Sequence, residues 1–106
     1  MNINEFLATE VMGWHKEGQT KDYQWVDSEG SDEEWAAFWN PSENISQAMM
    51  CLERFEGWEL TKDSVDGYLC VVWTTKHHGV WCDNAGGPSL PMAISLACAR
   101  AKGWKD

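Results

Sequence analysis

Residues 74–91 (TTKHHGVWCDNAGGPSLP) gather residue types that carry chemistry: two adjacent histidines, a cysteine and a pair of glycines. His77 and His78 precede Cys82 closely, which raises the hypothesis of a metal site or of a Cys–His nucleophilic pair. Adjacent residues of a strand point to opposite faces, so both imidazoles could bind one ion only if a turn distorted the chain. The third and fourth protein ligands that a metal ion would need are not found at any recognisable metal-site spacing. We therefore interpret the histidines as turn residues and predict no metal and no catalytic residue here.

The second half of this segment, residues 84–89 (NAGGPS), leads into a predicted helix. Backbone N–H groups at a helix N-terminus bind anions, and adjacent glycines let a phosphate approach closely. Nearby lysine and histidine would add positive charge, and tryptophan rings would stack on a base. A Walker loop is excluded because GK[ST] is missing, and a Rossmann motif because no βαβ unit follows. The alternative is a glycine-rich connection whose serine only caps the helix. The candidate ligand-binding residues are Trp73, Lys76, His77, His78, Trp81, Gly86, Gly87 and Ser89.

The four cysteines are too far apart for a CxxC pair, which argues against a structural zinc site. Each lies in an apolar stretch, where a reduced cysteine behaves as a small hydrophobic residue. We predict buried thiols in a cytosolic protein, with disulfides as the alternative. The four are Cys51, Cys70, Cys82 and Cys98.

The charge is distributed unevenly along the chain. Residues 1–67 contain 15 Asp and Glu against 4 Lys and Arg, a net charge of −11, and residues 68–106 contain 2 against 4, a net charge of +2; together these give the total of −9. Extended nucleic acid is therefore excluded as a partner, because phosphate contacts need clustered Lys and Arg. An anion would approach the C-terminal third.

The most acidic stretch is residues 27–35 (DSEGSDEEW), which reads as a loop that contains glycine. It is either a solvated surface segment or an acidic patch that interacts with another molecule. The acids concerned are Asp27, Glu29, Asp32, Glu33 and Glu34.

The chain also has eight tryptophans, which either fill a core that is poor in Leu and Ile or line a pocket or an interface.

Helical spacing of apolar residues predicts a first helix from Ile3 to Val11 that ends at Gly13. Polar and aromatic residues alternate over residues 22–26, which predicts a short strand. A second helix is predicted to begin with Asn40 as N-cap and Pro41 at N1. Its apolar stripe consists of Ile45, Ala48, Met49, Leu52 and Phe55, and Gly57 is expected to end it.

Three short strands follow, at residues 58–61, 68–75 and 80–83, with turns between them. Short links predict an antiparallel meander of at least three strands. The last helix is predicted from Ser89 to Lys102, with Gly103 ending it. Residues 1–106 should therefore form one α+β domain in which about three helices are layered on this sheet.

With these elements in place, the chain resembles the small phage proteins of the ABA sandwich domain family. The matching residues are Val11-Met12-Gly13-Trp14, Trp39-Asn40-Pro41-Ser42, Gly57-Trp58, Tyr68 to Trp73, and Ala93-Ile94 to Ala97. The resemblance implies a phage origin and layers of helix, sheet and helix. It implies no catalytic motif.

We therefore expect a non-enzymatic phage accessory protein that binds without a cofactor. The main hypothesis is an oligomer that sequesters a nucleotide-derived immune signal in the host cytoplasm, by analogy with other small phage proteins. The alternative is an inhibitor that docks its acidic surface on a host protein. We expect no membrane partner, because no run of about 18 apolar residues occurs, and no signal peptide, because the first ten residues have no basic region.

Overall fold

The computed structural model describes residues 2–18, 23–63, 67–76 and 79–105. The elements along the chain are α1 (Ile3–Phe6), the π-helix η1 (Leu7–Val11), β1 (His15–Glu17), β2 (Gln24–Val26), β3 (Asp32–Trp35), the 3-10 helix η2 (Ala36–Phe38), α2 (Ile45–Leu52), β4 (Gly57–Asp63), β5 (Gly67–Lys76), β6 (Gly79–Gly87) and α3 (Leu90–Ala101). The predicted α+β fold class is confirmed. Within the described ranges, no helix is long and apolar enough to cross a membrane.

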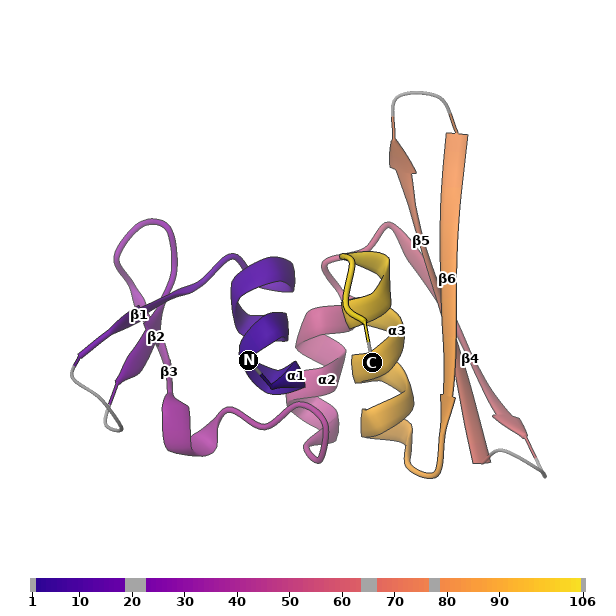
Figure 1. Cartoon of the computed structure of the whole chain (residues 1–106), viewed down its shortest axis with the longest axis horizontal. Helices are drawn as coiled ribbons and strands as arrows, with labels where there is room; N and C mark the ends of the chain where they lie inside the picture. Colours follow the sequence, from indigo (N-terminus) through magenta and orange to yellow (C-terminus); the bar gives the residue numbers. More distant parts are fainter. Residues whose placement is uncertain (1, 19–22, 64–66, 77–78, 106) are drawn as a thin grey trace.

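The helices lie between two antiparallel three-stranded sheets (Figure 1). The outer layer on each side is thus a sheet, whereas the family resemblance led us to expect a sheet between helices. The difference arises because the sequence pattern revealed only one strand, residues 22–26, of the first sheet. The layer order is sheet β1–β2–β3, helices, then sheet β4–β5–β6.

The sheet β4–β5–β6 is the meander predicted from the sequence, with longer strands. β6 continues through residues that we had interpreted as a glycine-rich connection, because Gly86 pairs with Leu69 and Gly87 pairs with Tyr68. Helix α3 packs against β5 and β6 and contacts α2 on another side. The predicted start and end of α3 are confirmed: the Ser89 hydroxyl accepts a hydrogen bond from the Met92 N–H at 3.3 Å, and the helix ends just before Gly103.

The acidic segment 27–35 is a turn followed by strand β3, so its interpretation as a loop is wrong. Asp27 stabilises the turn, since its Oδ1 accepts hydrogen bonds from the N–H groups of Glu29 and Ser31, both at 2.9 Å. β3 then pairs with β2, which pairs with β1. This strand was missed because charged residues fill its positions and leave no alternation of apolar and polar side chains.

Helix α2 begins at Ile45 and is capped by Asn44, whose Oδ1 accepts from the Gln47 N–H at 3.0 Å. The prediction of Asn40 as its N-cap is therefore wrong, because residues 41–43 form a separate turn. The helix also ends at Leu52, so Phe55 lies beyond it, and Gly57 begins β4 instead of ending the helix.

Asn40 belongs instead to a polar junction between α1 and the start of α2. Asn4 donates from Nδ2 to Asn40 Oδ1 at 2.9 Å, and its own Oδ1 accepts from the Ser42 N–H at 3.1 Å. The indole N–H of Trp39 donates to the Asn4 carbonyl at 2.7 Å. Gln47 completes the junction by accepting from the Asn40 N–H and donating to the Phe38 carbonyl. The Trp39–Ser42 motif of the family resemblance is thus a structural joint.

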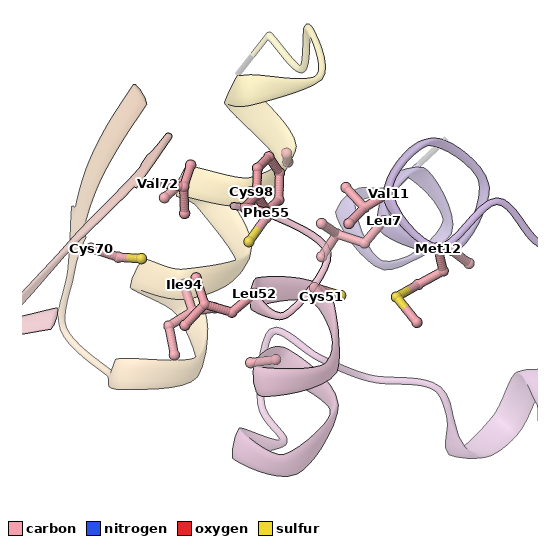
Figure 2. Packing of buried hydrophobic residues seen from close by; sticks show 14 of the residues in the cluster. Leu7, Val11, Met12, Cys51, Leu52, Phe55, Cys70, Val72, Ile94 and Cys98 are labelled. Carbon is pink, nitrogen blue, oxygen red and sulfur yellow. The ribbon is translucent and has the colours of Figure 1, made fainter. Parts of the chain in front are cut away.

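One hydrophobic cluster runs from Trp25 of the first sheet through the helices to the second sheet. Figure 2 shows the part of it between η1, α2, α3 and β5. Trp14, Trp25 and Trp39 are buried in it, and the rings of Trp14 and Trp39 meet edge to face with centroids 4.7 Å apart. These three tryptophans therefore fill the core, as one of the two interpretations of the tryptophan surplus predicted. Trp35 and Trp58 are exposed instead.

We predict that Asn4→Ala lowers the free energy of unfolding by about 1–3 kcal/mol, because at a partly buried joint it leaves the Ser42 N–H without its partner and removes one of the two donors to Asn40 Oδ1. Urea denaturation measures the change. Asn84→Ala, at an exposed position of β6, is the control and should change stability by less than about 0.5 kcal/mol. Equal effects of the two substitutions would contradict a stabilising role for the junction.

Ser95, in the middle of α3, is fully buried, and its hydroxyl has no hydrogen-bond partner among the described residues. We predict that Ser95→Ala raises the free energy of unfolding by about 1 kcal/mol, because it removes an unpaired buried polar group and improves helix propensity. Ser46→Ala, on the exposed side of α2, should gain only the propensity part. A loss of stability in Ser95→Ala would refute this account.

Candidate functional site

In segment 74–91, the two histidines stand in the sequence between Lys76 and Gly79, which pair at the end of the β5–β6 hairpin, and the cysteine follows them. His77 and His78 fall outside the described residues, so their prediction as turn residues stays a prediction. Cys82 is in strand β6, paired with Trp73 across the ladder. Within the part of the chain that the structure describes, no group of three or more His, Cys, Asp or Glu residues is arranged to hold a metal ion.

The glycine pair of the predicted anion site is explained by packing. A Cβ at Gly87 would lie 3.3 Å from the Ala93 N atom, so glycine allows the first turn of α3 to approach the end of β6. Gly86 occupies the neighbouring ladder position opposite Leu69. Ser89 caps α3. Strand pairing and close packing therefore account for the two glycines, and Ser89 acts as a helix cap, as the alternative interpretation expected of the serine.

The candidate ligand-binding residues that the structure describes do not come together in one place. Lys76 pairs with Gly79 at one end of the β5–β6 hairpin, whereas Gly87 pairs with Tyr68 at the other end. At about 3.3 Å per residue, the eight steps along β6 separate these ends by about 26 Å. Trp81 pairs with Thr74, so its position is on the face opposite to that of Trp73. The described residues therefore do not place Lys76, both tryptophan positions and the glycines in one pocket.

Trp73 has a specific structural partner on the face of the sheet turned away from the helices. It pairs with Gly57 of β4, and a Cβ built at Gly57 would lie only 2.2 Å from the indole ring. Glycine is required there because the ring lies flat across the neighbouring strand. Trp73 is half-buried by this contact alone.

The thiols that the structure describes are buried and free, as predicted. Burial raises the pKa of Cys51 from 9.0 to about 12 and that of Cys70 to about 11. Burial also raises the pKa of Cys98, and the neighbouring Cys51 and Cys70 raise it further. These three thiols converge on the core beside α3 (Figure 2). A nucleophilic cysteine needs a lowered pKa, so none of the three is activated.

The most exposed aromatic side chains lie at a place that the sequence analysis did not single out. Trp35, at the end of β3, is 50% exposed, and Phe38, at the end of η2, is 66% exposed. Glu33 and Glu34 precede them directly in β3. We call Glu33, Glu34, Trp35 and Phe38 the aromatic-acidic surface. The sequence offered one signal for it, since three aromatic residues within five positions cannot all face one core.

Local structure fixes which aromatic residues of this segment face outward. The Trp39 N–H donates to the Trp35 carbonyl at 3.1 Å, which closes one tight turn between the two tryptophans. The Ala36 N–H donates to the Tyr23 carbonyl at 3.1 Å and ties this turn to sheet β1–β2–β3. Trp39 then enters the core, while Trp35 and Phe38 remain outside.

The acids beside this surface differ in their proton affinity. Hydrogen bonds from backbone N–H groups, first that of Ser31, lower the pKa of Asp27, so it is charged at neutral pH. Partial desolvation and the hydrogen bond with Asp27 raise the pKa of Glu33. The Glu34 carboxylate accepts a hydrogen bond from the backbone N–H of Trp35 at 3.0 Å. This bond keeps the carboxylate close to the residue that carries the exposed indole.

The comparisons with known proteins identify the family. The family model of the phage ABA sandwich domain matches residues 5–99, so this chain belongs to that family. A solved phage protein from Bacillus cereus ATCC 14579 has the same fold: the alignment covers 98% of this chain and 87% of that chain, with a TM-score of 0.68 and 20% sequence identity. No curated protein matches this chain.

The raised pKa values of the buried thiols predict a pH dependence of stability. Thiols of the unfolded chain ionise near 9, whereas those of the folded chain stay protonated until about 11 to 12. Between these values the unfolded state has released protons that the folded state retains, so the free energy of unfolding should fall as the pH rises from about 9 towards 12. Urea denaturation at pH 8 and pH 10 measures this fall.

The variant Cys98→Ala provides the control, because it removes the thiol that is closest to both others. It should show a smaller fall between the two pH values than the wild type. Alkylation followed by peptide mapping gives a second measurement: Cys51, Cys70 and Cys98 should react only in denaturant. Rapid alkylation of any of them in the folded protein would contradict their burial.

Proposed function

We propose that this phage protein is a non-enzymatic binding protein that docks the aromatic-acidic surface on a basic surface of a host protein, in the host cytoplasm. The observation that carries the proposal is the exposure of Trp35 and Phe38 next to acids. Tryptophan is enriched among the residues that dominate binding energy at protein interfaces, because it buries a large area with few rotatable bonds.

The charge around this surface favours a basic partner. Residues 23–53, which include the whole surface, contain seven Asp and Glu and no Lys or Arg, while Arg54 lies close enough to Glu33 to lower the pKa of that carboxyl. A predominantly negative field accelerates encounter with an oppositely charged protein and disfavours partners of the same sign. The partner site should therefore be an apolar pocket rimmed by Lys and Arg.

The surface is held rigidly before any partner binds, which lowers the entropic cost of binding. Trp39 anchors the segment in the core through its contact with Trp14 and its hydrogen bond to the Asn4 carbonyl. The Gln47 side chain donates to the Phe38 carbonyl at 2.6 Å. The backbone that carries both exposed rings is thus tied to α1 and α2.

The nucleotide-sequestering hypothesis stays a prediction. The separation of its candidate residues along the β5–β6 hairpin makes it the less favoured of the two functions. A thermal-shift panel of cyclic oligonucleotides and cyclic ADP-ribose isomers tests it directly. A ligand-induced shift that survives substitution of Trp35 and Phe38 would favour sequestration over the function proposed above.

The test of the proposed function compares variants in pull-downs from host lysate, followed by calorimetry with the purified partner. The double variant Trp35→Ser/Phe38→Ser should weaken binding by about 30-fold or more, as expected for loss of a central aromatic pair. The double variant Glu33→Gln/Glu34→Gln should slow association and reduce the dependence of affinity on salt.

Trp58→Ser is the matched control, because Trp58 is also an exposed tryptophan, at 38%, but lies in β4 of the other sheet. It should leave binding unchanged. Each variant is first shown by urea denaturation to be folded. A partner that binds the Trp35→Ser/Phe38→Ser protein as tightly as the wild type would refute the proposal.

A further inference from the structure

We infer that the face of sheet β4–β5–β6 that is turned away from the helices binds the same face of a second copy of this chain. We call it the outer face; the ladder register places on it, among others, Gly57, Glu59, Thr61, Asp63, Leu69, Val71, Trp73, Cys82, Asn84 and Gly86. This inference concerns a different surface from the one proposed to bind a host protein and does not depend on that function.

The ladder register separates the two faces of the sheet. Cys70 pairs with Leu60 and with Ala85, and Cys70 and Ala85 are buried against the helices. The adjacent residue Leu69 therefore belongs to the opposite face. Figure 1 shows every helix and the other sheet on the inner side, so no described element covers the outer face.

Strand β5 has the composition of a strand that is covered on both sides. Its residues 68–73 (YLCVVW) form a continuous apolar run. Such runs are typical of strands buried on both faces, whereas a sheet with one face in water normally alternates apolar and polar residues. On the outer face, Leu69, Val71 and Trp73 remain half-buried with only their sheet neighbours around them.

The charge pattern selects a second copy as the occupant. In a chain of net charge −9, the described outer-face positions of β5 and β6 carry no charged residue, and the two charged positions of this face, Glu59 and Asp63, lie on the edge strand β4. A basic partner would find little to pair with, whereas two such faces can meet without bringing many carboxylates together. Interfaces of homodimers are correspondingly apolar.

The two outer faces would fit together about a two-fold axis that runs parallel to β5, midway between the two copies. It places β4 of each copy over β6 of the other, so that the two Glu59 residues lie on opposite sides of the interface, more than about 10 Å apart, where salt screens their repulsion. Gly86 leaves a depression beside Leu69. A residue from the other copy's β4 would fill this depression.

The size of the face sets the expected strength. Strands of 7, 10 and 9 residues, at about 3.3 Å per residue and about 4.8 Å between strands, give a planar area of about 400 Å² per copy. The two copies together would bury about 800 Å², below the range of standard specific interfaces and typical of weak ones. The dimer should therefore form in the micromolar range and dissociate on dilution.

Sedimentation velocity across about 1–500 μM tests the inference, with a concentration-dependent shift from monomer to dimer expected for the wild type. Val71→Lys should weaken the dimer by at least about tenfold, because it places a charge at the centre of each face. Val71→Thr, which preserves strand propensity, should weaken it less and guards against a folding defect in the lysine variant. Met50→Lys, on exposed α2, should dimerise like the wild type.

Three outcomes would overturn the inference: a wild-type protein that stays monomeric throughout, a dimer that survives both substitutions of Val71, or a host protein whose binding requires Val71 while the chain itself stays monomeric. Trp35→Ser/Phe38→Ser should leave the dimer intact, which keeps this test separate from that of host-protein binding.

Discussion

The fold depends on the close approach of helix α3 to the sheet and to the helices around it. Six of its residues are buried, and four of these are small: Ala93, Ser95, Ala97 and Ala99. The strands opposite it also carry small residues, since Ala85 and Gly87 of β6 are buried on the side of the helix. Because interiors pack at nearly crystalline density, a larger side chain at these positions would move the helix and everything that rests on it.

The residues that mark the family serve this architecture more than they serve chemistry. Trp39 and Asn40 tie α1 to the segment before α2, and Trp14 packs on Trp39. Gly57 accommodates the Trp73 ring. A sequence signature made of such structural contacts identifies the fold and does not by itself specify a function.

The sequence predicted those parts of the structure that local patterns decide. The meander β4–β5–β6, the cap of α3 at Ser89 and the buried thiols follow from periodicity and residue type. The pattern failed where tertiary contacts decide: Asn40 and Asn44 suit an N-cap equally well, and only the junction with Asn4 assigns them different roles. Strands β1 and β3 have no apolar alternation. The exposure of Trp35 and Phe38 could not be read from their types, because the same residue type is buried at position 39.

The turn between Trp35 and Trp39 has a consequence for how this protein can evolve. Within five positions, the backbone sends two aromatic rings into solvent and one into the core, and the spacing alone decides which ring goes where. Removing a single residue from Ala36–Phe38 would rotate the segment and exchange inside for outside. Substitutions of Ala36 and Ala37 should therefore be tolerated across related phages more readily than changes in the length of this stretch.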